Sequence, residues 1–480
     1  MFSLDNIKHK RVFEIFSEIA EIPHGSGNME KISDYCANFA EKNGLKCVKD
    51  SAFNVIIYKD ATVGYENSEP VILQGHLDMV CQAEEGYDID FENEGLKLYT
   101  DGDMLKAKGT TLGADNGIAV AMIMAILEDK TLSHPKIEAV FTTDEEVGML
   151  GATALDASCL TAKRMINIDS EEEDVITASC AGGIRFSAKI PFKTENKSGK
   201  AIKISLFGLL GGHSGVEIDK GRINADTLLG RVLNWLNLRY DFGLVSLSGG
   251  DKDNAIPKSA TAVLVTEQPT EVIELLNNCL ETIKTEISAA EPDFSYSVEC
   301  CSCDKTVCMD KKSKGSVIFA LCATPQGVVE FSSEIKGLVE TSLNLGVLNT
   351  EDNVVCFHYA LRSNKASALE GLTDKMKAFY SVIECETETS GYYPPWEFKQ
   401  NSLFREIYAK TYTELLGKQP RIDAIHAGLE CAVFSSKIEG LDCISIGANM
   451  YDIHTHNERL SISSTEKIYR LLITVLRNLK

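Results

Sequence analysis

The amino-acid sequence predicts an α/β protein. A discontinuous first domain, with a mostly parallel central sheet flanked by helices, is interrupted by an inserted α+β domain. Three observations support this fold class: apolar β-branched runs alternate with helical patterns over the first part of the chain, the pattern changes between residues 189 and 388, and it returns afterwards. A length of 480 residues also favours two domains over one.

The first part of the chain begins with two helical segments. Residues 10–22 repeat apolar side chains at helical spacing, and residues 28–44 run from an Asn cap to a terminal Gly. Residues 111–130 are apolar nearly all round, which predicts a buried helix. Short strand-like runs surround it, at residues 54–58, 70–75, 137–143 and 164–169. In such sheets, ligand sites gather at the carboxyl ends of the strands.

The inserted domain is expected to span residues 189–388 and to mix strands with helices. Its runs of regular pattern lie at residues 201–209, 223–236, 259–266, 271–287 and 354–363. A loop rich in Gly, Tyr and Pro at residues 390–398 marks the return to the first domain. Helix, strand and helix patterns then resume, so the first domain is expected to comprise residues 1–188 and 389–480.

The composition is that of an ordinary globular protein with an acid excess. Apolar residues make up 44% and charged residues 25% of the chain, and the formal net charge is −22. This balance argues against nucleic-acid or membrane partners, because both call for basic patches. No secretory leader and no apolar run of about 18 residues is visible, so we expect a cytoplasmic protein.

Fifteen cysteines occur without a compact spacing framework, which favours reduced thiols. One group contains potential ligands for a soft metal: Cys300, Cys301, Cys303 and Cys308. It lacks the paired C-x-x-C spacing of zinc ribbons and alternates like a strand that runs into a loop. The sequence therefore favours a structural interpretation of this group.

Acids and imidazoles end the apolar runs at five separate places: His76 with Asp78, Asp115, Glu145 with Glu146, Asp169, and His454. Each residue alone has an ordinary interpretation, because such residues commonly cap helices, form turns or stay solvated. The joint pattern indicates more, since imidazole and carboxylate ligands suit Zn²⁺, Mn²⁺ or Co²⁺. Two such ions about 3.5–4 Å apart are an established device for activating water.

Seven motifs follow one another along nearly the whole chain: GHLDMV, GTTLGADNGIA, TTDEEVGMLGA, INIDSEE, GLLGGHSG, HAGLEC and HTHNE. Together they resemble the co-catalytic zinc exopeptidases related to aminoacylase and glutamate carboxypeptidase. Within that family, the bacterial aminoacyl-histidine dipeptidases, which are carnosinase-like Xaa-His dipeptidases, are the most similar. The resemblance implies a catalytic domain with an inserted lid domain, and a homodimer formed through the lid.

The resemblance also implies two divalent metal ions per subunit, with zinc as the first expectation and manganese or cobalt as alternatives. In the family pattern, Asp115 is the carboxylate that bridges the two ions. His76 and Asp169 complete one metal site, and Glu146 and His454 complete the other. The two sites are thus built from five separate segments of the chain.

Three further side chains receive catalytic roles from the resemblance. Glu145 is expected to be the general base that takes a proton from the metal-bound water and passes it to the leaving amine. Asp78 is expected to accept a hydrogen bond from the second ring nitrogen of His76. His213, in the inserted domain, is expected to donate to the developing oxyanion.

Five residues are candidates for contacts with the substrate, including its α-carboxylate: Asn224, Arg362, His426, Gly428 and Glu430. Two departures from the family pattern bear on the site. HTHNE replaces the more usual His-Ser-Pro-Asp-Glu and adds His456 beside His454, although the preceding SIGA segment favours His454 as the ligand. KGRINA also differs from the expected form, which leaves the side-chain preference open.

The resemblance therefore predicts a metal-dependent dipeptidase, either of Xaa-His type, including β-Ala-His, or of broad specificity. An N-acyl amino-acid deacylase or a tripeptidase of the same family is the alternative, because the sequence does not show the depth of the lid pocket. A catalytically silent binding protein is a third hypothesis, but no ligand or base is missing. A glycosidase with paired carboxylates would leave the histidines unexplained.

Overall fold

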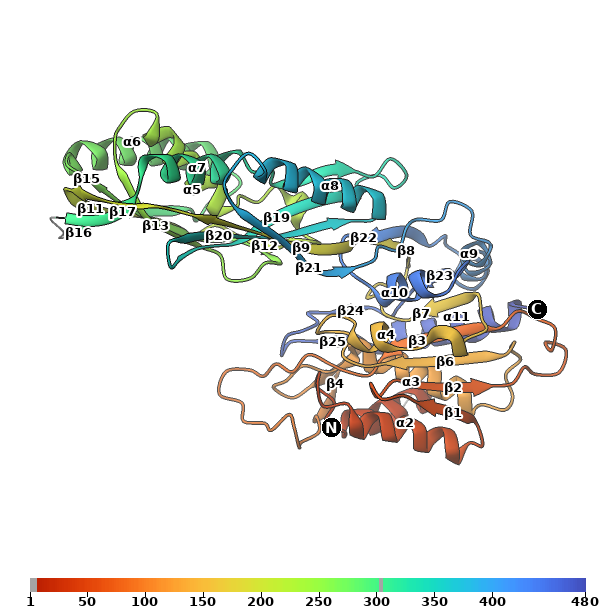
Figure 1. The fold of residues 1–480 in the computed structure, drawn as a ribbon. Helices are drawn as coiled ribbons and strands as arrows, with labels where there is room; N and C mark the ends of the chain where they lie inside the picture. Colours follow the sequence, from red (N-terminus) through yellow and green to blue (C-terminus); the bar gives the residue numbers. More distant parts are fainter. Residues whose placement is uncertain (1–6, 302–304) are drawn as a thin grey trace. The chain divides into compact units, whose positions relative to one another are not determined.

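The computed structural model describes residues 7–301 and 305–480, which form two compact units. Unit 1 holds the chain up to Cys180 together with Phe398–Ala424 and Leu429–Lys480. Unit 2 holds Ala181–Glu397 and the short segment Ile425–Gly428. Figure 1 shows the chain in sequence colours, with unit 1 drawn from both ends of the colour bar.

The boundaries of the units differ from the predicted ones, which fell at residues 188/189 and 388/389. The reason is strand pairing. Strand β9 (Gly182–Pro191) and strand β21 (Glu386–Tyr393) cross these positions, and they pair with each other in the sheet of unit 2. Each strand must therefore belong to unit 2 over its whole length, which moves both boundaries outward.

The main sheet of unit 1 has eight strands, in the order β1 (Lys46–Lys49), β2 (Val55–Lys59), β6 (Ile137–Thr142), β3 (Val71–His76), β7 (Arg164–Asn167), β23 (Asp442–Ser445), β8 (Val175–Cys180) and β22 (Arg421–Ile425). The four central strands, β6, β3, β7 and β23, are parallel, while the pairs β1–β2, β2–β6 and β23–β8 are antiparallel. The parallel centre places the carboxyl ends of β3, β6 and β7 at one edge of the sheet.

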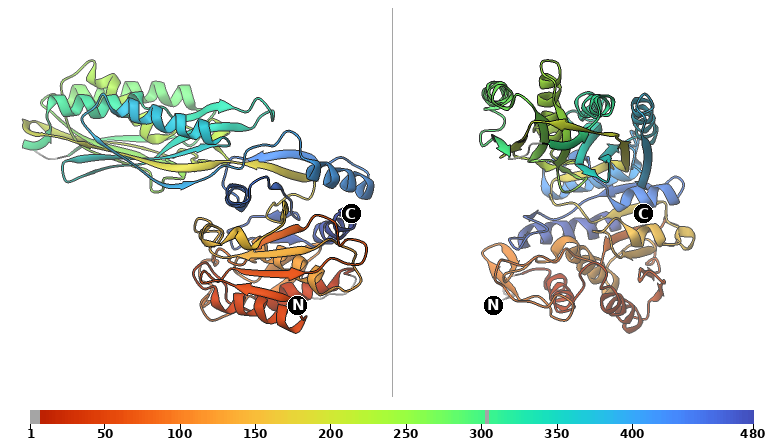
Figure 2. Two further views of the ribbon diagram at one scale, coloured as in Figure 1. Left: turned by 45° about the vertical axis from the view of Figure 1, so that its right-hand side comes forward. Right: turned by 60° about the vertical axis from the view of Figure 1, so that its left-hand side comes forward.

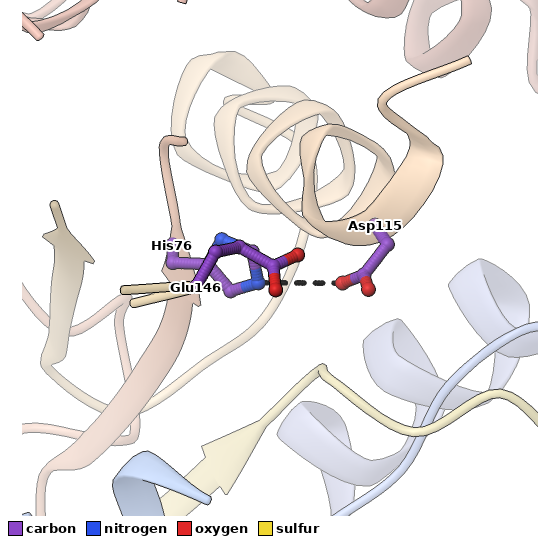
Figure 3. Close-up of side chains that lie close together, drawn as sticks. All are labelled: His76, Asp115 and Glu146. Atoms are coloured by element: carbon purple, nitrogen blue, oxygen red, sulfur yellow. Dashed lines mark ion pairs between the residues drawn. The ribbon is translucent and has the colours of Figure 1, made fainter. Parts of the chain in front are cut away.

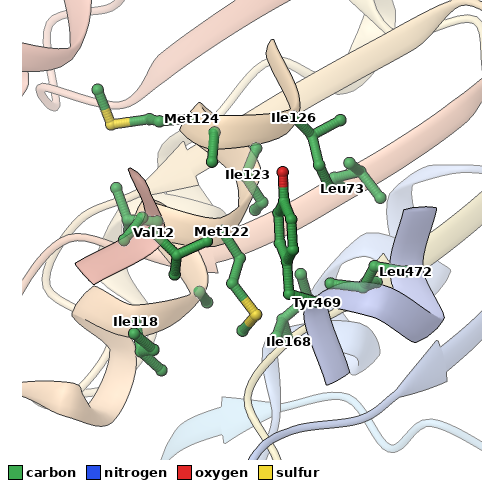
Figure 4. Close-up of a cluster of buried hydrophobic side chains, with 14 of the residues drawn as sticks. Val12, Leu73, Ile118, Met122, Ile123, Met124, Ile126, Ile168, Tyr469 and Leu472 are labelled. Atoms are coloured by element: carbon green, nitrogen blue, oxygen red, sulfur yellow. The ribbon is translucent and has the colours of Figure 1, made fainter. Parts of the chain in front are cut away.

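The helices of unit 1 are α1 (Lys10–Ala20), α2 (Glu30–Lys42), α3 (Ala114–Glu128), α4 (Leu150–Ala154), α9 (Leu403–Leu416), α10 (Glu430–Lys437) and α11 (Ile462–Asn478), with a 3₁₀ turn at Ala157–Cys159. The predicted buried helix is α3. It is apolar on all sides because it packs between α1, strand β3 and side chains of α11 such as Tyr469 and Leu472 (Figure 4).

A small antiparallel sheet completes unit 1, with the order β24 (Met450–Tyr451), β25 (Arg459–Ser461), β5 (Met104–Ala107) and β4 (Leu98–Asp101). Strands β24 and β25 form a hairpin, and its turn carries the HTHNE segment. Strand β25 also pairs with β5, which precedes the loop that leads into α3. The C-terminal hairpin is thereby tied to a segment more than three hundred residues earlier in the chain.

Unit 2 is an α+β unit built on one long antiparallel sheet, in the order β16 (Ser295–Cys301), β11 (Lys200–Phe207), β15 (Ala260–Thr266), β13 (Gly243–Gly249), β19 (Val339–Glu351), β20 (Val354–Ser363), β9 and β21, with β18 (Gly327–Phe331) added beside β19. Four helices cover one face of this sheet (Figure 2): α5 (Ala225–Asn237), α6 (Pro269–Ile287), α7 (Lys311–Ala323) and α8 (Ala366–Tyr380).

Two short ribbons and one 3₁₀ turn make up the rest of unit 2. Strand β10 (Thr194–Ser198) pairs with β17 (Lys305–Met309), and β12 (Gly212–His213) pairs with β14 (Ala255–Ile256). The 3₁₀ turn, Ile218–Lys220, follows β12. Strand β12 holds Gly212 and His213 of the GLLGGHSG motif.

The cysteine group does not form a cluster of ligands among the described residues. Cys300 and Cys301 are exposed at the end of β16, whereas Cys308 is buried on β17, and Cys303 lies outside the described residues. The cysteines of the described part of the chain form no disulfide bonds with one another. Within the same ranges, no helix combines the length and apolar character needed to cross a membrane.

Candidate metal centre and polar cluster

The opening motif places His76 at the end of β3, with its side chain buried. Asp78 follows, and its carboxylate oxygen Oδ1 lies 3.4 Å from Nδ1 of His76. The same carboxylate accepts the backbone N–H groups of Glu145 at 2.9 Å and of Glu146 at 3.2 Å, and the hydroxyl of Ser26 at 2.8 Å. Asp78 therefore holds both the imidazole and the turn that carries the two glutamates.

Asp115 lies between two imidazoles from distant parts of the chain. Its Oδ1 is 3.3 Å from Nε2 of His76, and its Oδ2 is 3.2 Å from Nε2 of His454. The Nε2 atom of each imidazole has one further carboxylate nearby: Asp169 lies 3.4 Å from that of His76, and Glu146 lies 2.8 Å from that of His454. His76, Asp115 and Glu146 offer ligand atoms that all lie within 4.8 Å of one another (Figure 3).

Local backbone geometry brings these side chains together. The turn after β6 carries Asp144 with φ 52° and Met149 with φ 56°, both left-handed, and it folds Glu145 and Glu146 back towards Asp78. Before α3, Gly113 has φ 67°, and a Cβ atom there would lie 2.8 Å from Sδ of Met79. A larger residue at this position would displace the loop that presents Asp115.

The electrostatics are those of a site with excess negative charge. Hydrogen bonds to Asp115 and Glu146 raise the pKa of His454 to about 10. Burial opposes protonation of His76, but Asp169 and Asp115 outweigh it, so the pKa of this imidazole also lies well above its usual value. Burial raises the pKa of Asp169 to about 6. The carboxylates thus outnumber the groups that neutralise them, which is the chemistry of a cation site.

Of the two histidines of HTHNE, His454 is the one that lies beside the carboxylates. His454 reaches both Asp115 and Glu146, whereas the ring of His456 contacts the amide of Asn457 at 3.2 Å. His454 has φ 60°, a left-handed conformation that turns its side chain out of the hairpin. Imidazole and carboxylate groups of this kind are ligands that suit divalent cations.

Unit 2 contains a second polar cluster of the opposite character. Nδ1 of His213 accepts the backbone N–H groups of Gly215 at 3.2 Å and of Val216 at 3.3 Å. Because Nδ1 is an acceptor, the neutral ring carries its proton on Nε2. Burial, followed by the positive charge of Arg362, lowers the pKa of His213, so the ring is a neutral donor at pH 7.

Arg362 is buried on β20, and its Nη1 donates to the hydroxyl of Tyr393 at 2.7 Å. Its Nε has no hydrogen-bond partner, and among the described residues no carboxylate lies within ion-pair distance of the guanidinium. His426 lies 2.7 Å from the hydroxyl of Ser342 and 3.1 Å from Oδ1 of Asn364. Burial and the charges of Arg362 and His213 lower the pKa of His426 to about 3.

Comparison with known proteins agrees with this geometry. Residues 72–478 match the family described as peptidase family M20/M25/M40. The chain belongs to this family. The predicted family, fold class and enzyme class are therefore confirmed, and the protein is a metal-dependent peptidase with a discontinuous α/β unit and an inserted α+β unit.

Individual relatives are similar over the full length. The peptidase is 37% identical over 483 residues to the cytosol non-specific dipeptidase of Escherichia coli (strain K12). The aligned region covers 100% of this chain and 99% of the relative. The structure of aminoacylhistidine dipeptidase from Vibrio alginolyticus matches with 35% identity and a TM-score of 0.90 over 99% of this chain and 98% of that one. Aminopeptidase PepT from Bacillus cereus ATCC 10987, at 16% identity and a TM-score of 0.60 over 98% and 99% of the two chains, shares the fold.

Two of the five predicted substrate residues have their side chains occupied inside the peptidase. Asn224 caps α5: its Oδ1 accepts from Asp226 and Thr227, and its Nδ2 donates to Asn344 and Leu345. No hydrogen-bonding capacity of this amide is left for a substrate, so the structure gives Asn224 a structural role instead of the predicted one.

Glu430 begins α10 and is fully buried. Its Oε2 accepts from Gln74 and from Thr142, the latter at 2.7 Å, and its Oε1 has no partner. Glu430 thus lies beneath the carboxyl ends of β3 and β6 and offers no exposed atom to a substrate. Gly428 lies with His426 in the segment Ile425–Gly428, whose backbone bonds to Ala181 within unit 2.

Several residues of the site escaped the sequence analysis. Ser26 binds Asp78, and Tyr393 and Ser342 contact Arg362 and His426. None of these residues stands in a motif that marks it out. Glu458 does belong to a motif, as the last residue of HTHNE. Its carboxylate accepts hydrogen bonds from the backbone of the loop before α3.

Proposed function

We propose that this peptidase hydrolyses dipeptides at a centre of two divalent metal ions. The observation that carries the proposal is the position of Asp115, whose two carboxylate oxygens face two separate imidazoles, each accompanied by its own carboxylate. The full-length similarity to a relative named cytosol non-specific dipeptidase supports the substrate class.

The proposed ligands are His76 and Asp169 for one ion, His454 and Glu146 for the other, and Asp115 for both. Zinc is the proposed metal, with manganese or cobalt as alternatives, because imidazole and carboxylate ligands accept all three. Two bound ions lower the pKa of a shared water molecule and polarise the scissile carbonyl. Asp78 supports His76 at Nδ1, with its backbone carbonyl at 3.0 Å and its carboxylate at 3.4 Å.

Glu145 is the proposed general base. Burial, together with nearby Asp169, Glu430 and Glu146, raises its pKa well above the usual value. A carboxylate with a raised pKa is a competent proton acceptor that can then return the proton to the leaving amine. Its backbone N–H is fixed by Asp78, so the base and the ligand Glu146 share one anchor.

Unit 2 is the proposed source of contacts to the substrate. Arg362 is a buried guanidinium without a carboxylate partner, which suits the α-carboxylate of a dipeptide. The Nε2–H of His213 is the proposed donor to the developing oxyanion. His426 lies beside this pair, and its role is to hold Ser342 and Asn364 in place.

The side-chain preference is proposed to be broad and to include Xaa-His dipeptides. Two full-length relatives carry names of these two kinds: one is a cytosol non-specific dipeptidase and the other an aminoacylhistidine dipeptidase. A location in the cytosol and a homodimer formed through unit 2 complete the proposal. Hydrolysis of N-acyl amino acids or of tripeptides remains the alternative for the same centre.

The test is a panel of substrates with metal-stripped protein. Ala-His, β-Ala-His, Gly-Gly, Leu-Leu, an N-acetyl amino acid and a tripeptide are assayed before and after addition of Zn²⁺, Mn²⁺ or Co²⁺. We expect dipeptide hydrolysis that depends on added metal and is absent from Asp115→Asn. Activity towards the N-acetyl amino acid or the tripeptide, without any towards a dipeptide, would overturn the proposal.

A further inference from the structure

Glu458 makes an unusual set of contacts for a carboxylate near the end of the chain. Its side chain is buried, and its two oxygens accept four consecutive backbone N–H groups. Oε2 accepts from Leu112 at 2.7 Å and Gly113 at 3.1 Å, and Oε1 accepts from Ala114 at 2.9 Å and Asp115 at 3.3 Å. The last of these residues is the proposed bridging ligand.

Glu458 also belongs to the hairpin that carries His454. Strands β24 and β25 flank the turn, Arg459 forms an ion pair with Asp452 across it, and the backbone N–H of Glu458 donates to Thr455. His454 therefore stands in a turn that is closed at its base by Glu458. The carboxylate of Glu458 connects this turn to the loop before α3.

We propose that Glu458 is a positioning residue for the metal centre: it fixes the loop that presents Asp115 against the hairpin that presents His454. This inference rests on the proposed function. Asp115 is shared by both ions, whereas His454 belongs to one ion alone. The distance between Asp115 and His454 therefore sets how tightly that ion is bound. Glu458 touches neither ion nor substrate, and it acts through the backbone of its neighbours.

A purely structural interpretation is that Glu458 caps α3. Gly113 at the N-cap position has no side chain to cap the helix, and a carboxylate at a helix N-terminus is favourable. That interpretation predicts a loss of stability alone. The proposal predicts, in addition, a weaker metal centre in protein that is still folded.

Glu138 provides a matched control within unit 1. It is also buried, and it accepts backbone N–H groups from Thr161 and Ala162 at 2.9 and 3.1 Å. It lies near the start of β6, at the opposite end of the strand from the glutamate turn. Glu138 also forms an ion pair with Lys136 at 2.8 Å. Glu138→Gln therefore disturbs a buried carboxylate with several partners without touching either segment of the centre.

The experiment compares Glu458→Gln and Glu138→Gln in the full-length chain. Zinc affinity is measured by competition with a chromophoric chelator, after thermal unfolding has shown that each metal-free variant is folded. We expect Glu458→Gln to weaken binding of the more weakly held zinc ion about 10–100-fold, as second-sphere changes commonly do. With dipeptide as substrate, kcat falls and KM stays unchanged. Glu138→Gln is expected to lose stability only.

Glu458→Asp keeps the charge but shortens the side chain by one methylene group, and it carries the same measurement if Glu458→Gln does not fold. We expect it to remain weaker than the natural protein, because position matters here as well as charge. Zinc affinity equal to that of the natural protein in both Glu458 variants, or an equal loss in Glu138→Gln, would overturn the inference and leave the proposed function intact. Failure of the natural protein to bind Zn²⁺, Mn²⁺ or Co²⁺ would overturn both.

Discussion

Both polar clusters of this peptidase contain histidine side chains, but the electrostatic surroundings of these imidazoles are opposite. His454 in unit 1 has its pKa raised to about 10 by hydrogen bonds to Asp115 and Glu146. His426 in unit 2 has its pKa lowered to about 3 by burial and by Arg362 and His213. The residue type is identical, so the neighbours alone decide whether the imidazole favours a proton.

This contrast indicates different ligands for the two clusters. The carboxylates around His76 and His454 attract a cation. A metal ion bound there would replace the protons that the imidazoles share with these carboxylates. In unit 2, a buried guanidinium and neutral imidazoles offer donors, which suits a carboxylate or a developing oxyanion. A dipeptide undergoing hydrolysis presents both kinds of demand, since its carbonyl is polarised and its terminus is anionic.

The largest expected effect concerns the base of unit 1. Glu145→Gln is expected to lower kcat about 10²–10⁴-fold, because the amide cannot accept the proton of the metal-bound water. Metal content, measured by elemental analysis, should stay at two ions per chain. Loss of both ions from this variant would instead identify Glu145 as a metal ligand and would contradict its assignment as the general base.

The next effect tests the neutral imidazole of unit 2. His213→Ala is expected to lower kcat about 10²–10³-fold by removing the oxyanion donor, while zinc affinity is unchanged. His358→Ala, which removes an imidazole from β20 of the same unit, is the control and should leave kcat unaltered. Equal kcat values for His213→Ala and the natural protein would refute the donor role.

Arg362 tests whether unit 2 recognises an anion. Arg362→Met is expected to raise KM about 10–100-fold for dipeptides, because a charge-assisted hydrogen bond is lost, and to leave metal content unchanged. The natural protein should discriminate between a dipeptide and its C-terminal amide, and the variant should not. Arg185→Met, which alters an exposed arginine paired with Asp253, is the control. Persistent discrimination in Arg362→Met would place the carboxylate site elsewhere.

The smallest effect concerns Asp226, a buried acid of unit 2 that lacks the imidazole neighbours found in unit 1. Neither of its carboxyl oxygens has a hydrogen-bond partner, and burial raises its pKa well above the usual 3.8. The folded protein therefore retains a proton that the unfolded chain releases near that value. The free energy of unfolding should fall as pH rises from there towards the folded pKa.

Asp226→Asn removes this titration. We expect the variant to be more stable than the natural protein by about 1–3 kcal/mol near pH 8, with a smaller difference near pH 4. Thermal unfolding across this pH range measures the effect, and Asp251→Asn, at an exposed position of the same unit, is the control. A variant that is less stable at every pH would show that the acid has a stabilising partner.

The amount that could be predicted from the sequence differs between the parts of the site. His76 ends β3, Asp169 and Glu146 lie in the turns that follow β7 and β6, and Asp115 lies in the first turn of α3. The positions of the strand ends therefore brought these side chains to one edge of the sheet. The roles assigned to these residues stay predictions until metal binding is measured. The contacts of Asn224 could not be predicted from the sequence, because its side-chain amide hydrogen-bonds to β19 as well as to its own helix.

What the sequence by itself determined is local. A helix that is apolar on all sides must be buried, and polar residues at the ends of parallel strands must meet, because the periodicity of each element dictates which face is covered. The tertiary structure decided three further features: the extent of each unit, the position of the proton on His213, and the hydrogen bonds between Glu458 and the loop before α3. Each depends on hydrogen bonds between groups that only the folded chain brings together, and no local pattern encodes such partners.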